Sequence, residues 1–196
     1  MSEFSKNFMK WCASKTSTFI ETGTFKGATT YMASQYFDQV MSVELDQLNY
    51  VSAKYRLGPY KNIELYQGDS LSRIEEMIEN AKGPITFWLD AHPMDPNVDA
   101  ACPLLEELEI IAKSKNKEKH IILIDDLQRS LRGEGDYPPL VEMETRLKKI
   151  NPSYFIKQLP FKTWQEAKYA PTILCASPID ISFPPKFYRN SPLGLW

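Results

Sequence analysis

Short apolar runs alternate along the chain with segments in which apolar residues recur every three or four positions. Five runs rich in Val, Ile, Phe and Tyr have the length and composition of buried strands: residues 18–22, 40–44, 62–66, 85–89 and 120–124. Between them, residues such as Leu48, Val51 and Tyr55 fall on one helical face. Strands that alternate with helices predict βαβ crossovers and a parallel sheet.

The pattern changes toward the C-terminus. Residues 154–159 and 172–176 are typical of two strands, and the segment between them has no helical periodicity. Such a pair predicts an antiparallel hairpin at the end of a parallel sheet. We expect one domain over residues 1–196, with residues 1–17 as a short N-terminal cap and residues 179–196 as a tail rich in Pro and aromatics.

Composition and charge exclude some classes of protein. The charges of the 23 basic and 25 acidic residues nearly cancel. The chain has no Lys/Arg-rich block, which argues against a nucleic-acid partner. The N-terminus lacks an apolar run long enough for a membrane span. Cys12, Cys102 and Cys175 lie far apart without a CxxC pair, which favours a reducing compartment and a cytoplasmic location.

The carboxyl end of every expected parallel strand carries an acid, within the strand or just after it. These acids are Glu21, Glu44 with Asp46, Asp69, Asp90, and the pair Asp125–Asp126. Ligands of open α/β sheets bind outside the carboxyl ends of the strands. The sequence therefore predicts a ligand site with a negative rim.

The first strand leads into a glycine turn that fits neither common phosphate motif. With only Gly23 and Gly27, the turn lacks the GxxxxGKS/T pattern and the third glycine of GxGxxG. An acidic rim repels phosphates and attracts cations. S-adenosylmethionine, which has a sulfonium, an ammonium and one carboxylate but no phosphate, suits this field.

Each acid then has an expected partner on this cofactor. We expect Glu21 to hold the ammonium, directly or through water, and Glu44 to accept hydrogen bonds from the ribose hydroxyls. We expect Asp69, with Ser70 beside it, to accept from the adenine amino group. The turn formed by Thr22, Gly23, Thr24, Phe25 and Gly27 would hold the carboxylate through backbone N–H groups.

Structural alternatives remain open for the same residues. The glycines also suit a turn packed against a strand, Glu44 suits a solvated loop, and Asp69 or Ser70 suits a helix N-cap.

The motifs "ETGTFKG", "SVELD", "GDS", "LDAH" and "IDD", in this order, resemble those of the class I, Rossmann-like S-adenosylmethionine-dependent methyltransferases. The resemblance covers roughly residues 15–178. It implies a three-layer αβα sandwich around a seven-stranded, mostly parallel sheet with an antiparallel last strand. It also implies cofactor contacts by Gly23 and its neighbours, by Glu44 and by Asp69.

Asp90, Asp125 and Asp126 are expected beside the methyl group of the cofactor. Three adjacent carboxylates cannot all stay ionised without a cation or protons, and Mg²⁺ or Mn²⁺ prefers such oxygen ligands. We expect Asp90 and His92 to be catalytic, with His92 as the general base. The alternatives are a helix cap at Asp125–Asp126, a turn at Asp90 and a solvated His92, while His120 is expected to be structural.

The pattern "LDAH…IDD" resembles the divalent-metal-dependent O-methyltransferases, in both their catechol and sugar branches. Position 126 is Asp in this chain, whereas the catechol branch generally has Asn there, and this difference favours the sugar branch. We therefore predict an enzyme that methylates a sugar or glycan hydroxyl. The alternatives are a catechol-type small-molecule O-methyltransferase, a non-catalytic cofactor-binding module and a nicotinamide-dependent reductase.

Two further segments bear on the acceptor. Residues 129–139 suggest a lid that carries Arg129, Arg132 and Tyr137 toward the substrate, or else a surface loop. Trp164 and Tyr169 suit stacking on a sugar or packing at the sheet edge. The short chain and its aromatic tail favour a part of a larger multidomain protein that assembles glycans.

Overall fold

The computed structural model describes residues 3–92, 101–159 and 172–181. Trp164, Tyr169 and most of the aromatic tail lie outside these residues. The strands are β1 (Thr18–Thr22), β2 (Gln39–Glu44), β3 (Ile63–Gln67), β4 (Ile85–Leu89), β5 (Ile121–Ile124), β6 (Phe155–Leu159) and β7 (Ile173–Ser177). All five expected parallel strands form within one residue of their expected bounds.

The strands form one sheet in the order β3-β2-β1-β4-β5-β7-β6. The pairs from β3 to β5 are parallel, whereas β7 pairs antiparallel with both β5 and β6. The prediction of a seven-stranded, mostly parallel sheet with an antiparallel last strand is confirmed. In the hairpin, β7 inserts beside β5 and leaves β6 at the edge.

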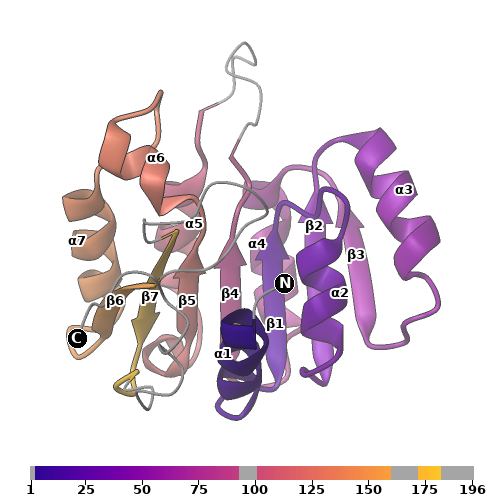
Figure 1. The fold of residues 1–196 in the computed structure, drawn as a ribbon, viewed down its shortest axis with the longest axis horizontal. Coiled ribbons are helices and arrows are strands. Elements are labelled where there is room, and N and C mark those ends of the chain that lie inside the picture. Colours follow the sequence, from indigo (N-terminus) through magenta and orange to yellow (C-terminus); the bar gives the residue numbers. More distant parts are fainter. Residues whose placement is uncertain (1–2, 93–100, 160–171, 182–196) are drawn as a thin grey trace.

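Seven α-helices accompany the sheet in the described part of the chain. They are α1 (Glu3–Ala13), α2 (Ala28–Ser34), α3 (Gln47–Leu57), α4 (Ser70–Glu79), α5 (Leu104–Ile111), α6 (Leu127–Arg132) and α7 (Leu140–Ile150). As Figure 1 shows, α1 and α2 cover the near face of the sheet, and α4 and α5 lie behind it. The result is a three-layer αβα arrangement.

Successive strand residues face the two helical layers alternately, as the period of two in a strand requires. Phe19 and Trp88 pack with α1 and α2. Their neighbours Ile20 and Leu89 pack with α4, α5 and α7. Burial on both faces explains why these strands are continuous apolar runs rather than alternating ones.

Helix α3 departs from its sequence pattern. Leu48, Val51 and Tyr55 share a helical face, yet Leu48 is 81% exposed and Tyr55 is 88% exposed. The helix contacts the sheet through Ala53 and Leu57 instead. An apolar period thus located the helix correctly but not the face that it buries.

None of the helices in the described ranges combines the length and the apolarity that a membrane span requires.

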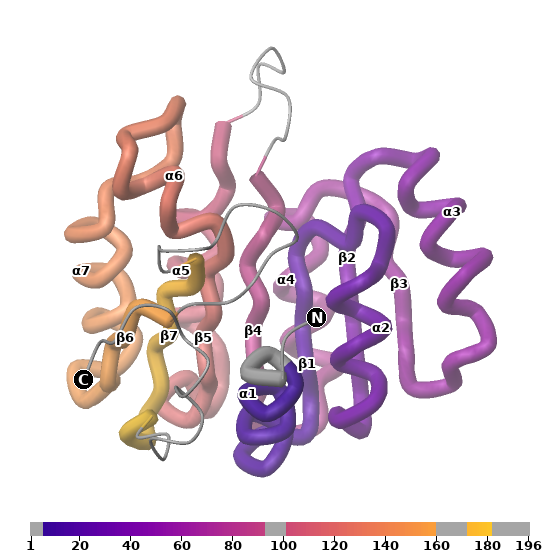
Figure 2. The backbone as a smooth tube through the Cα atoms, in the orientation of Figure 1, coloured from indigo at the N-terminus to yellow at the C-terminus, as the bar shows by residue number. Residues whose placement is uncertain are grey.

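The fold gathers the carboxyl ends of β1 to β5 at one edge of the sheet, the upper edge in Figure 1. Helix α6 follows β5 directly and stands at this same edge, at the upper left of the trace in Figure 2. The acids predicted to follow these strands therefore meet there.

Candidate active site

The turn after β1 brings two strand ends into close contact. Gly23 has a φ of +87°, and a Cβ there would lie 2.4 Å from the backbone oxygen of Asp90. The N–H of Gly23 donates to the Val43 oxygen of β2 at 3.0 Å. Gly27 has a φ of +69° and approaches Leu57 of α3 as closely. The packing alternative for both glycines is therefore real, and it leaves room for a ligand role of the turn backbone.

Glu21 of β1 is buried, with 1% of its surface exposed. Its Oε2 accepts from the Thr30 hydroxyl at 2.5 Å and from the Ser42 hydroxyl at 2.6 Å. Burial, opposed in part by these two hydrogen bonds, raises its pKa from 4.5 to about 7. The side chain links β1 to Thr30 of α2 and Ser42 of β2, and its contact with a cofactor ammonium, directly or through water, stays a prediction.

Glu44 lies at the end of β2 with its carboxylate held by two backbone amides. Oε2 accepts from Phe25 N–H at 2.6 Å, and Oε1 accepts from Asp46 N–H at 2.8 Å. The first bond ties β2 to the glycine turn, where Phe25 has a left-handed φ of +45°. A carboxylate has about four lone-pair sites, so Glu44 can still accept from two further donors.

Asp69 serves as the N-cap of α4. Its Oδ1 accepts from Leu71 N–H at 2.9 Å and from Ser72 N–H at 3.3 Å. The capping alternative is confirmed, and a contact between Asp69 and adenine stays a prediction. Ser70, the first residue of the helix, is buried.

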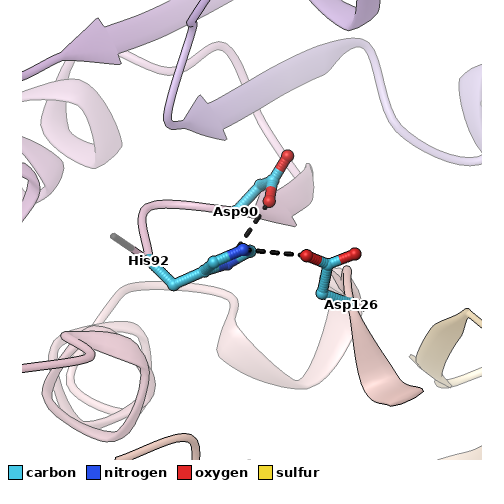
Figure 3. A group of neighbouring side chains, drawn as sticks. All are labelled: Asp90, His92 and Asp126. Atoms are coloured by element: carbon cyan, nitrogen blue, oxygen red, sulfur yellow. Dashed lines mark ion pairs between the residues drawn. The ribbon is translucent and has the colours of Figure 1, made fainter. Parts of the chain in front are cut away.

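Asp90, His92 and Asp126 converge at the ends of β4 and β5, as Figure 3 shows. His92 Nδ1 lies 3.5 Å from Asp90 Oδ1, and His92 Nε2 lies 2.9 Å from Asp126 Oδ2. One ligand atom from each of the three lies within 4.8 Å of the others. Two carboxylate oxygens and one imidazole nitrogen are a donor set that suits a divalent cation.

Asp126 adopts a left-handed conformation with a φ of +53°. It occupies the N-cap position of α6, but its side chain caps no helical N–H. The carboxylate instead contacts His92 and accepts from Gln128 Nε2 at 3.2 Å. A non-glycine residue held in this conformation is strained by about 1 kcal/mol, which points to a role for Asp126 beyond capping.

Asp125 is not part of this group. Its side chain is buried, and its Oδ1 accepts from the Asp126 N–H at 2.8 Å. Burial and the neighbouring Asp126 raise its pKa to about 7. Direct metal ligation by Asp125 therefore stays a prediction, whereas His92 joins the candidate ligand set.

The pKa values of the two aspartates in this group shift in opposite directions. Burial, followed by the charges of Asp125 and Asp126, raises the pKa of Asp90 well above its usual value. The hydrogen bond from His92 lowers the pKa of Asp126. A dication at this position would relieve the repulsion on Asp90, so the electrostatics and the donor set agree.

Tyr137, from the segment after α6, reaches the same place. Its ring contacts the His92 ring edge-on at a centroid distance of 5.7 Å, and Arg129 lies over the Tyr137 ring at 5.6 Å. The Tyr137 hydroxyl donates to the backbone oxygen of Asp125. Of the predicted lid residues, Tyr137 is thus buried against the site, and Arg132 is paired with Glu134 at the surface.

His120 is structural, as expected. Its Nδ1 accepts from Ile85 N–H at 3.1 Å, and its ring packs edge-on against Phe87. Burial lowers its pKa to about 4. The imidazole therefore stays neutral and links β4 to β5 at the end remote from the acids.

The sequence interpretation missed Glu107, a buried acid on α5. Glu107 falls on the same helical face as Leu104 and Ile111, yet it is 1% exposed. Burial raises its pKa to about 7. A charged residue on an apolar helical stripe is the signal that could have revealed it.

Comparison with known proteins supports the fold. No protein-family model and no curated protein matches the sequence. Among solved structures, an O-methyltransferase from Bacillus cereus in complex with SAH is 16% identical, with a TM-score of 0.63, over 90% of this chain and 81% of that chain.

Two other structures are similar. TomG, an O-methyltransferase of Streptomyces achromogenes involved in tomaymycin synthesis and solved with SAM, is 13% identical, with a TM-score of 0.61, over 90% of this chain and 80% of its own. The SAH-bound methyltransferase PaMTH1 of Podospora anserina is 13% identical, with a TM-score of 0.58, over 92% of this chain and 80% of its own. The chain has the Rossmann-like fold of these methyltransferases.

Proposed function

We propose that the protein is an S-adenosylmethionine-dependent O-methyltransferase that acts with a divalent cation. The observation that carries this proposal is the group formed by Asp90, His92 and Asp126. It lies at the carboxyl edge of a methyltransferase-type sheet, beside the glycine turn of β1. Ligands of such sheets bind at this edge.

The residues around the turn fit a cationic cofactor without phosphates. Glu44 is anchored by two amides and keeps lone pairs for two ribose hydroxyls. The acids Glu21, Glu44, Asp90 and Asp126 stand at the carboxyl ends of the four neighbouring strands β1, β2, β4 and β5, so a sulfonium beside them gains favourable charge interactions. The turn from Thr22 to Gly27 would bind the carboxylate of the cofactor through its backbone amides.

The cation would be held by Asp90, Asp126 and His92. A bound dication lowers the pKa of an acceptor hydroxyl and fixes its oxygen relative to the methyl donor. Because methyl transfer is a single displacement, orientation contributes much of the catalysis.

His92 has two candidate roles, as a cation ligand or as the general base. The 2.9 Å contact between Nε2 and Asp126 Oδ2 orients the ring. If His92 is a ligand, His92→Ala weakens Mn²⁺ binding, and if it is the base, the same change lowers kcat with Mn²⁺ affinity unchanged. Direct Mn²⁺ titration beside steady-state kinetics measures both.

The acceptor we propose is a sugar or glycan hydroxyl, supported by the acid at Asp126 in place of an amide. A catechol-type small molecule is the second candidate. It is favoured by the similarity to an O-methyltransferase involved in tomaymycin synthesis. A panel of methyl-acceptor sugars and catechols, assayed with radiolabelled cofactor, separates the two classes. A cytoplasmic location is supported by Cys12, Cys102 and Cys175, which are buried free thiols.

The central test is calorimetric titration with S-adenosylhomocysteine, with and without Mn²⁺. We expect binding, an increase in the melting temperature by mass action, and turnover that EDTA abolishes and Mn²⁺ restores. Asp90→Asn should lose the Mn²⁺ effect. The matched control is Asp38→Asn, an exposed acid that directly precedes β2, at the amino end of the sheet. Absence of binding would refute the cofactor, and turnover unchanged by EDTA would refute the cation.

A further inference from the structure

Helix α3 has apolar residues on two opposite faces. Ala53 and Leu57 are buried, and they attach the helix to the sheet. Leu48, Val51 and Tyr55 are spaced by three and four residues and share the opposite side, which we call the outer face of α3. These three side chains are 81%, 55% and 88% exposed. A group of large apolar side chains that the fold does not bury indicates an interaction surface.

Cations flank the outer face. Lys54 lies on one side of it and Arg56 on the other, and both are exposed, as is Lys61 just after the helix. Residues 47–62 contain no Asp or Glu. Within the described part of the chain none of these three cations forms an ion pair, whereas every other described arginine does. The surface therefore combines apolar tips with positive charge that no acid neutralises.

This charge argues against a second copy of the chain as the occupant. A two-fold contact places the same patch of both copies at one interface. Lys54 and Arg56 of each copy would then meet there, and residues 47–62 offer no acid to pair with them. An anionic partner complements the patch instead. Because a helix face is convex and its apolar tips project, the partner must also accept inserted side chains.

We propose that the outer face of α3 binds the surface of a membrane that contains anionic phospholipids. Leu48 and Val51 would enter the boundary between headgroups and acyl chains, with Tyr55 at the level of the headgroups. Lys54 and Arg56 would extend to the lipid phosphates. The aliphatic tips favour lipid over a free anionic glycan. A few apolar residues bind weakly alone, so the cations supply a second signal and the binding is reversible.

The outer face adjoins the candidate active site. Helix α3 begins at Gln47, just after Glu44 ends β2, and Figure 1 shows its first turn near the upper edge of the sheet, where the acids gather. A membrane on this face would lie beside the proposed cofactor site. Binding to the membrane does not depend on the proposed function, but together they imply an acceptor carried by a lipid.

The test is flotation of the protein with vesicles. We expect binding to an equimolar mixture of phosphatidylglycerol and phosphatidylcholine, at least about tenfold weaker binding to phosphatidylcholine alone, and release at high salt. Leu48→Gln combined with Tyr55→Gln should weaken binding to the mixed vesicles by at least about tenfold. Lys54→Gln combined with Arg56→Gln should weaken it by about tenfold and remove the preference for anionic lipid.

The matched control lies on α7, where Val141 and Lys149 are an exposed apolar residue and an exposed base. Val141→Gln combined with Lys149→Gln should bind the vesicles as the wild type does. Melting curves check that each variant folds, and calorimetry should show unchanged binding of S-adenosylhomocysteine.

Four outcomes would overturn the inference and leave the proposed function intact. They are no binding to either vesicle, equal binding to both, equal losses in the α3 and α7 variants, and binding to polyglutamate without binding to vesicles, which would assign the face to an acidic protein. Vesicle binding by a protein that does not bind S-adenosylhomocysteine would overturn the proposed function and support the membrane inference.

Discussion

Single residues at the carboxyl edge show how much a side chain's role depends on its partners. Glu21 lies near the carboxyl end of β1 and Asp126 lies just past β5. The Glu21 carboxylate accepts hydrogen bonds from two buried hydroxyls, whereas the partly exposed Asp126 carboxylate contacts His92. Their pKa values shift in opposite directions as a result. An acidic side chain near the carboxyl end of a strand therefore supports the fold in one case and offers a ligand atom in the other.

Glu21→Gln tests the buried acid. The pKa of Glu21 rises from 4.5 to about 7 on folding, so its contribution to stability is full below pH 4.5 and is lost as the pH rises through 7. Gln is neutral and its oxygen can still accept. Between pH 5 and pH 8, the free energy of unfolding of the variant should fall by about 1–3 kcal/mol less than that of the wild type. Urea denaturation at both pH values measures the two falls.

The control for Glu21→Gln is Glu75→Gln, an exposed acid on α4, which should leave the pH dependence of the wild type unchanged. Equal pH dependence of Glu21→Gln and the wild type would mean that Glu21 ionises normally in the folded protein.

At the scale of elements, the glycine turn joins β1, β2 and β4. Its backbone bonds to Val43, its side-chain acceptor Glu44 comes from β2, and Gly23 touches Asp90 after β4. The turn thus fixes the position of β1 relative to Glu44 at the cofactor site and to Asp90 in the acid group. A change in its backbone should be felt by the cofactor site and by the acid group together.

A comparison of Gly23→Ala with Gly133→Ala separates the cost of a steric clash from the cost of backbone strain. Both glycines have a left-handed φ, but a Cβ at Gly23 meets Asp90 at 2.4 Å, while one at Gly133 meets nothing within 4 Å. We expect Gly133→Ala to cost about 1 kcal/mol from backbone strain alone. Gly23→Ala should cost more and abolish S-adenosylhomocysteine binding, as measured by urea denaturation and calorimetry. Similar losses in both variants would contradict the role of the close contact.

The elements also show where sequence periodicity succeeds. Strands β1, β2, β4 and β5 were predictable because both of their faces are buried, which demands continuous apolar runs. Helix α3 packs at the end of the sheet through Ala53 and Leu57, so its larger apolar residues remain exposed. Periodicity reports a helix wherever apolar residues recur, but the neighbouring elements decide which side is buried.

Across the whole molecule, a nearly neutral chain concentrates its buried acids at one edge. The net charge is −2, yet burial raises the pKa values of Glu21, Glu107 and Asp125 to about 7. The folded protein is therefore more stable when these acids are protonated or when a cation is bound beside them. The opposite shift of His120, to about 4, acts mainly below pH 6.5.

We predict that the melting temperature falls between pH 6 and pH 8 in the presence of EDTA. Acids with raised pKa values lose their protons over this interval, and the unfolded chain, with its normal pKa values, gains relative stability. Mn²⁺ should reduce the fall by binding the ionised group at pH 8, and Asp90→Asn should remove the Mn²⁺ effect. Thermal denaturation at pH 6 and pH 8 measures these melting temperatures. A melting temperature that rises toward pH 8 in EDTA would contradict the prediction.

The sequence by itself determined the order and type of the seven strands and of the helices that connect the parallel ones, and it determined that an acid stands at the carboxyl end of each parallel strand. Both properties are local, because strand and helix periods and strand ends are written in consecutive residues. Only the tertiary structure decided that His92 lies between Asp90 and Asp126, that Asp125 turns to a backbone amide, and that Glu107 is left with an unpaired oxygen. These outcomes depend on side-chain directions and on contacts between residues far apart in the chain, which no local pattern encodes.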